Sequence, residues 1–265
     1  MALRLFSRKS GPPSPSDAVS RAVILKHLLV TALATPPPDL LSTLSSSSTA
    51  AEQQAFLDEL RARRRESVRA LQESGLWELM SPAERSFLTT SPEAVPEQAL
   101  RDVSWLMEAA ECLLWALGHV EALPAYDTQA DIEHLKRLPA GTVRDLQRSA
   151  ILRDPKALSV ARDVAELWHW RSRTRQLMEN GTPVTTPQGL TLSDVIRLAA
   201  EQAASRGDIP AAIEDDFPVF GRSYAQASSE EWAQVTSIAM ERHRAFNWLC
   251  GYAPRNLWQD TPTDT

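Results

Sequence analysis

The chain has 265 residues, of which 43% are hydrophobic and 23% are charged, values typical of a globular protein. Its formal charge of −6 argues against binding of nucleic acid or an anionic membrane by the whole surface. Two cysteines without a CxxC spacing exclude a disulfide framework, and no apolar run approaches the ~18 residues of a membrane span. Since the N-terminus also lacks the apolar core of a signal peptide, we expect a soluble, cytoplasmic protein.

The composition predicts a mainly α fold, because alanine and leucine are abundant, Val and Ile are sparse, and only nine glycines are present. Residues 1–16 end in a Pro/Ser-rich stretch and are expected to form a flexible leader. Residues 17–265 are expected to form one compact multi-helix domain. Helix start and stop signals predict the first helices at 17–34, at 52–74 and from the capping box Ser81-Pro-Ala-Glu84 onward.

A central helix is expected over about 96–117, where the sequence is apolar on nearly all sides. Its apolar residues are Val103, Trp105, Leu106, Cys112, Leu113, Leu114, Trp115 and Leu117. A helix of this kind belongs in the centre of a bundle. Glu108 lies within it and is the most isolated carboxylate of the chain.

The C-terminal half predicts long helices at 154–179 and 191–206 and a final helix at about 229–250. Between the last two, residues 208–226 interleave apolar side chains with Asp, Pro and Gly. This segment is expected to form a small β-hairpin or an ordered loop.

Five groups of residues carry a family resemblance: Glu73–Trp77 with Ser81–Glu84; Ser104-Trp105 with Glu108 and Leu113–Gly118; His169-Trp170 with Arg173; Asp216-Phe217 with Gly221; and Glu241–Tyr252 with Thr263–Thr265. On these residues the chain, over roughly 17–265, resembles the bacterial domain-of-unknown-function 4272 family. The resemblance supports the outline of the fold and identifies the residues named above as positions of interest. It implies no activity, because the family has none established.

The final helix carries the main candidate residues. His243 lies one turn after Ala239 and one turn before Asn247, at or beside the buried stripe. Polar groups in an apolar setting need partners, and a buried carboxylate such as Glu108 needs a cation or a raised pKa. We therefore expect a polar cluster whose members are Glu108, His169, Arg173, Arg242, His243 and Asn247. It is either a network that sets helix register or a ligand or catalytic pocket.

Templates for known chemistry are missing from the sequence. It has no Walker loop, GxGxxG, HExxH or GxSxG motif, and none of its five histidines has metal-ligand spacing, so no metal and no cofactor are expected. The basic run Arg61–Arg65 alternates with acidic residues and favours a solvated face over a nucleic-acid contact. The segment 135–175, with ten Lys/Arg against four Asp/Glu, keeps nucleic-acid binding as a third possibility.

Besides nucleic-acid binding, two functions of different classes remain. The first is a non-enzymatic protein that binds another protein, as an accessory factor or a toxin-neutralising partner. The second is a small-molecule binder or enzyme that uses the inward-facing Glu/His/Arg cluster. Neither is expected to involve a membrane.

Overall fold

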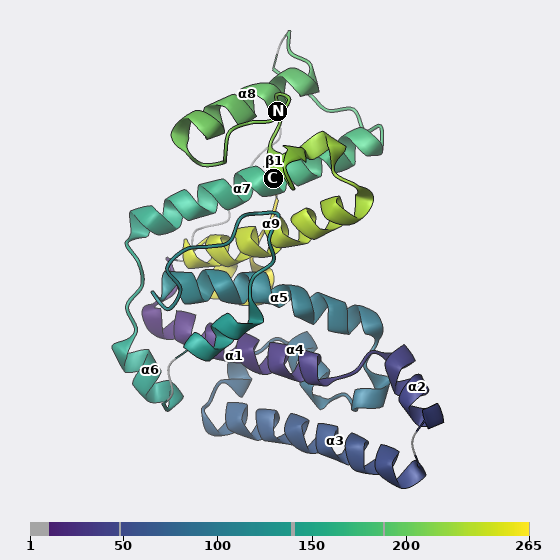
Figure 1. Cartoon of the computed structure of the whole chain (residues 1–265). Coiled ribbons are helices and arrows are strands. Elements are labelled where there is room, and N and C mark those ends of the chain that lie inside the picture. Colours follow the sequence, from purple (N-terminus) through teal and green to yellow (C-terminus); the bar gives the residue numbers. More distant parts are fainter. Residues whose placement is uncertain (1–10, 48, 139–140, 188, 265) are drawn as a thin grey trace. The chain divides into compact units, whose positions relative to one another are not determined.

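The computed structural model describes residues 11–47, 49–138, 141–187 and 189–264 (Figure 1). Contacts divide the chain into two units, each with its own interior. One contains 13–122 and 131–152, and the other contains 1–12, 123–130 and 153–265. The predicted leader lies mostly outside the described residues, and the first helix begins at Pro15, before the predicted boundary. The mainly α fold is confirmed.

The first unit, called the N-unit below, is built on two helices that pack along each other, α1 and α5. Its elements are α1 (Pro15–Ala34), α2 (Pro38–Ser47), α3 (Ala50–Glu73), α4 (Pro82–Thr89), α5 (Glu97–Ala116) and α6 (Val143–Ser149), with short 3-10 turns η1 (Trp77–Leu79), η2 (Pro92–Ala94) and η3 (Ile132–Arg137). The continuous buried run Met107–Leu114 confirms burial of the second half of α5, whereas residues 101–106 in its first half are exposed or half-buried.

Local sequence explains where the helices of the N-unit begin. The predicted capping box at Ser81 and Glu84 starts α4 as expected. The cap of α1 is Ser14, and Asp17, where the helix was predicted to start, occupies the third helical position and completes a capping box with Ser14. Oγ of Ser14 accepts a hydrogen bond from the backbone N–H of Asp17, at 3.2 Å. A cap of this kind stabilises a helix by about 1 kcal/mol.

The second unit, called the C-unit below, is built on α7 and α9, which run alongside each other (Figure 1). Its elements are α7 (Pro155–Glu179), α8 (Leu192–Arg206), β1 (Pro218–Val219), β2 (Arg222–Ser223) and α9 (Ser229–Leu249), with 3-10 turns η4 (Tyr224–Gln226), η5 (Pro254–Asn256) and η6 (Trp258–Asp260). The predicted small hairpin is confirmed. Its two-residue turn, Phe220-Gly221, has φ of 50° and 72°, as a type I′ turn requires.

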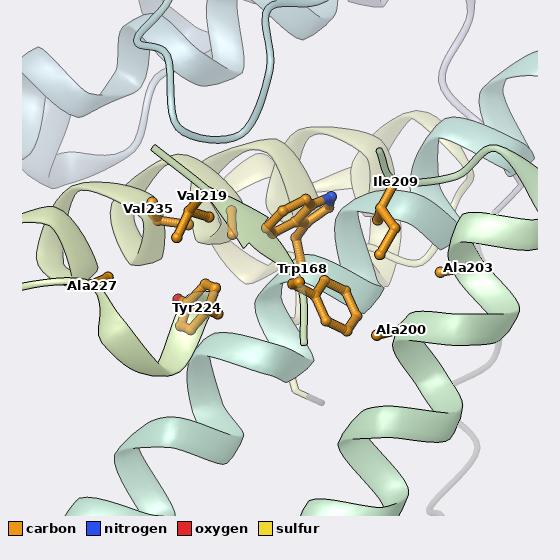
Figure 2. Packing of buried hydrophobic residues seen from close by; sticks show 10 residues of the cluster. Trp168, Ala200, Ala203, Ile209, Val219, Tyr224, Ala227 and Val235 are labelled. Carbon is orange, nitrogen blue, oxygen red and sulfur yellow. The ribbon is translucent and has the colours of Figure 1, made fainter. Parts of the chain in front are cut away.

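The core of the C-unit forms around Trp168 of α7. Figure 2 shows Trp168 among side chains of the hairpin (Val219), α8 (Ala203), the segment after α8 (Ile209) and α9 (Val235). Its ring lies 5.2 Å from that of Phe217 in an edge-on arrangement. Because removing a buried tryptophan costs about 3–5 kcal/mol, Trp168 contributes strongly to the position of α7.

The end of α9 is shaped by Gly251, which has a φ of 77°. A Cβ at this position would lie 2.8 Å from backbone atoms of Gly11 and Pro12. Gly251 therefore permits both the left-handed turn and the close approach of the first described residues.

Candidate functional site

The candidate polar cluster forms in part within the C-unit, where α7 and α9 bring together His169, His243 and Asn247. All three side chains are buried, and His243 is completely so. Nδ1 of His169 lies 3.0 Å from Nδ1 of His243, and Nε2 of His243 lies 2.9 Å from Nδ2 of Asn247. His243 and Asn247 are four residues apart and therefore adjacent on one face of α9.

Hydrogen bonds at Asn247 determine the direction of this network. Nε of Arg162 donates to Oδ1 of Asn247 at 3.0 Å, and Nδ2 of Asn247 donates to the carbonyl oxygen of Pro262 at 2.8 Å. The amide nitrogen is a donor, so Nε2 of His243 must accept and Nδ1 of His243 must carry the proton. That proton is donated to Nδ1 of His169, whose own proton is then on Nε2. The network thus runs in one sense from Arg162 to His169.

Electrostatics keep both imidazoles neutral. Burial, followed by the charge of Arg173, lowers the pKa of His169 to about 4. The charge of Asp264 acts in the other direction and raises this pKa, but by less. Burial, followed by the neighbouring His169 and Arg162, lowers the pKa of His243 to about 3. At neutral pH neither histidine carries charge, which agrees with the donors and acceptors assigned above.

Arg162 was missed by the sequence analysis, although a signal existed. It lies seven residues before His169, two turns away on the same face of α7, and the helical period alone would have included it. Its guanidinium also lies over the ring of Tyr252, 4.7 Å from the centroid. Arg162 therefore links α7 to the chain that follows α9.

Two predicted cluster residues of the C-unit have other contacts. Arg242 is fully buried and donates to the carbonyl oxygens of Pro124 and Thr128, at 2.6 and 3.1 Å, with its guanidinium over the ring of Tyr126. Arg173 is exposed and donates to the side-chain oxygen of Gln176. Arg173 acts on the cluster through its charge alone.

Glu108 lies in the other unit, where it is buried on α5. Its place in one cluster with Arg173, Arg242 and His243 stays a prediction. A second acidic residue of α5, Glu111, is fully buried and lies 2.7 Å from Nδ1 of His134. This Glu111–His134 pair lies within the N-unit and was not among the residues predicted from the sequence.

A buried ion pair next to the hairpin was also missed. Arg171 makes two hydrogen bonds to the carboxylate of Asp216, at 2.7 and 2.6 Å. The same carboxylate accepts from the backbone N–H groups of Phe217 and Ala225. Arg171 also lies over the ring of Tyr224, at 4.4 Å, so this pair positions the hairpin against α7.

Two cavities of the N-unit adjoin α3. The first, called the α1–α3 groove, has a volume of about 320 Å³ and is lined by residues that include Lys26, His27, Val30, Leu60, Arg63 and Glu66. The second, called the α3–α4 cavity, has a volume of about 330 Å³ and is lined by residues that include Arg61, Arg65, Arg69, Thr89 and Ser91. Arg64 lines both cavities.

Within the described parts of the chain, no helix is long and apolar enough to cross a membrane. The same residues contain no group of three or more His, Cys, Asp or Glu side chains arranged to hold a metal ion.

A family model described as Domain of unknown function (DUF4272) matches residues 11–190. The chain belongs to this family. The match to DUF4272 covers the whole N-unit from its first helix and all of α7, including Glu108, His169 and Arg173. It ends before the hairpin and α9, so the resemblance noted at Asp216–Gly221 and Glu241–Tyr252 lies outside the matched range. Comparisons with curated proteins and with solved structures gave no match.

Membership in DUF4272 brings no activity with it, and the chemistry of this chain has to be argued from its own residues. His169 lies inside the matched region, whereas His243 and Asn247 lie outside it. The DUF4272 match therefore covers the α7 side of the hydrogen-bonded network but not the α9 side.

Proposed function

We propose that this DUF4272 protein is a non-enzymatic bacterial protein of the cytoplasm that binds another protein through the α1–α3 groove. The observation that carries the proposal is the exposed apolar edge of that groove. Val30 is 50% exposed and lines the groove, and Leu33, one turn further along α1, is 61% exposed. Exposed apolar side chains that adjoin a groove are typical of protein-interaction sites.

Charge on the rim indicates the chemistry of the partner. Lys26, Arg63 and Arg64 line the groove together with a single carboxylate, Glu66. A helical segment with apolar residues on one face and acidic residues beside them would match this lining. An accessory factor of a larger assembly and a neutralised toxin could both present such a segment.

The histidine cluster supports a non-enzymatic role. Both histidines are held neutral, with pKa values of about 4 and about 3, far below the value near 7 that suits a general acid or base at neutral pH. Both ring nitrogens of His243 are already used in hydrogen bonds inside the cluster. The alternative, an enzyme or small-molecule binder that uses this cluster, would need these bonds to open.

The test compares two valines that are equally exposed on helices. A photo-crosslinking residue is introduced at Val30 and, as a matched control, at Val160 of α7, which is also 50% exposed. In cells of the native host we expect a single defined protein to crosslink at position 30 and not at position 160.

The purified partner is then titrated against three forms of the protein: unmodified, Val30→Asp and Val160→Asp. We expect Val30→Asp to weaken binding at least tenfold, about 1.4 kcal/mol, and Val160→Asp to leave it unchanged. The proposal fails if crosslinking is the same at both positions or missing, or if both variants bind as the unmodified protein does.

A further inference from the structure

The arginines of α3 differ in the number of hydrogen bonds and ion pairs that they make with the rest of the protein. Arg61 is paired with Asp58 at 2.9 Å and with Glu93, and Arg63 is paired with Glu59 at 2.6 Å. Arg69 is 3.9 Å from Glu73, and both side chains are about 70% exposed, so this contact contributes little. Arg65 makes no hydrogen bond or ion pair with any described residue.

Arg64, which is buried, also has a hydrogen-bond donor that the protein does not use. It is 5% exposed and donates to the carbonyl oxygens of Phe87 and Thr90 and to Oγ1 of Thr35. Its Nε is buried and has no hydrogen-bond partner among the residues that the structure describes. An unpaired donor on a buried, charged group costs free energy and is uncommon in folded proteins.

These features meet in the α3–α4 cavity. Its described lining includes four arginines, Arg61, Arg64, Arg65 and Arg69, and no Asp or Glu. Its volume, about 330 Å³, lies in the range of small-molecule sites. Ser91, at the opposite wall from α3, adds an exposed hydroxyl that can donate a hydrogen bond.

We propose that the α3–α4 cavity binds a small soluble compound that carries phosphoryl groups. Planar guanidinium groups match phosphate oxygens with paired N–H donors, and several of them around one cavity can neutralise more than one negative charge. Arg65 and Arg69 supply charge that the protein leaves largely uncompensated, and Arg64 supplies a buried cation at the cavity wall. This site is separate from the α1–α3 groove and does not depend on the protein-binding role proposed for it.

Inorganic pyrophosphate is the probe. Titration calorimetry of the full chain, with ionic strength held constant by sodium chloride, is expected to give saturable binding at micromolar to millimolar pyrophosphate. The double variant Arg65→Gln/Arg69→Gln is expected to weaken this binding at least tenfold. Both side chains are exposed, so the variant keeps its fold, which circular dichroism verifies.

Arg63→Gln is the matched control, because Arg63 lies on the same helix but lines the other cavity. It is expected to leave pyrophosphate binding within about twofold of the unmodified protein, a difference of less than about 0.5 kcal/mol. Equal weakening by Arg63→Gln and by the double variant would show non-specific attraction to the helix and overturn the proposal.

Two further outcomes would also overturn it. One is that pyrophosphate at millimolar concentration does not bind. The other is that the protein binds vesicles containing phosphatidic acid but not pyrophosphate, which would make the ligand a membrane headgroup rather than a soluble compound.

Discussion

The polar cluster of the C-unit and the arginine face of α3 are both rich in polar groups on helices, and they differ in how those groups are used. In the cluster, Arg162, Asn247, His243 and His169 form one directed chain of hydrogen bonds. On α3, by contrast, Arg65 and the buried Nε of Arg64 have no hydrogen-bond partner among the described residues. A closed network stabilises the fold, whereas the exposed, unused donors of Arg65 beside a cavity are available to a ligand.

This difference bears on two expectations drawn from the sequence. The histidine cluster was expected to be either a register-setting network or a ligand pocket, and the run Arg61–Arg65 was expected to be a solvated face. Burial favours the first interpretation of the cluster, because it lowers the pKa of both histidines and forces them to find internal partners. The exposed Arg65 and Arg69 face no such demand.

The largest expected effect is on the buried ion pair of the C-unit. Asp216→Asn removes the charge that compensates Arg171, which is 2% exposed, and should lower the free energy of unfolding by about 3–5 kcal/mol. Urea denaturation measures the change. The control is Glu201→Gln, which removes an exposed pair with Arg197 and should cost less than about 0.5 kcal/mol. Equal effects in the two variants would contradict the structural role assigned to Asp216.

The second effect is a pH dependence that only the closed cluster should show. The unfolded chain binds protons on its histidines near pH 6.5, whereas the folded chain resists protonation down to about pH 4 at His169 and about pH 3 at His243. The two histidines therefore leave the free energy of unfolding unchanged above about pH 6.5. As the pH falls below that value, only the unfolded chain gains protons on them, and the free energy of unfolding decreases. Between pH 7 and pH 5 the loss should be about 2 kcal/mol for each histidine.

Urea denaturation at several pH values tests this, with His169→Gln/His243→Gln as the comparison. The double variant should be less stable at pH 7 but should lose less on acidification, since the remaining titrating groups are the same in both proteins. An identical pH slope in the two proteins would show that the histidines titrate normally and that the network is open.

The smallest expected effect is on the stability contribution of the α3 arginines. Arg65→Gln/Arg69→Gln should change the free energy of unfolding by no more than about 0.5 kcal/mol, because exposed side chains with weak or missing ion pairs contribute little. Thermal and urea denaturation without added anion measure it. A loss above about 2 kcal/mol would mean that these arginines are structural, and the contrast with the histidine cluster would disappear.

Much of the fold could be predicted because helix signals are local. The capping box at Ser81, the buried run Met107–Leu114, the hairpin within 208–226 and the start of α9 near residue 229 all follow from spacing and turn chemistry over a few residues. The position of His243 and Asn247 on one face of α9 follows from the same helical period. These features depend on neighbours in the chain and not on distant contacts.

The partners of the polar side chains could not be predicted in this way. Arg171 finds Asp216 across 45 residues, Arg162 finds Asn247 across 85, and Arg242 finds the carbonyl oxygen of Pro124 across 118. Each pairing depends on which helix faces pack together. The helical period predicts the face on which a residue lies, but it does not predict which other element packs against that face. Composition likewise could not show that α3 borders two cavities.

The sequence by itself determined the helical class, most helix boundaries and the residues that had to be buried, because hydrophobic period and capping act within a few turns. Tertiary packing alone decided that His169 would meet the second ring nitrogen of His243, and that Arg64 and Arg65 would line a cavity. The physical reason is that the free energy of a polar group depends on whether its partners are supplied, and packing alone supplies partners from distant parts of the chain.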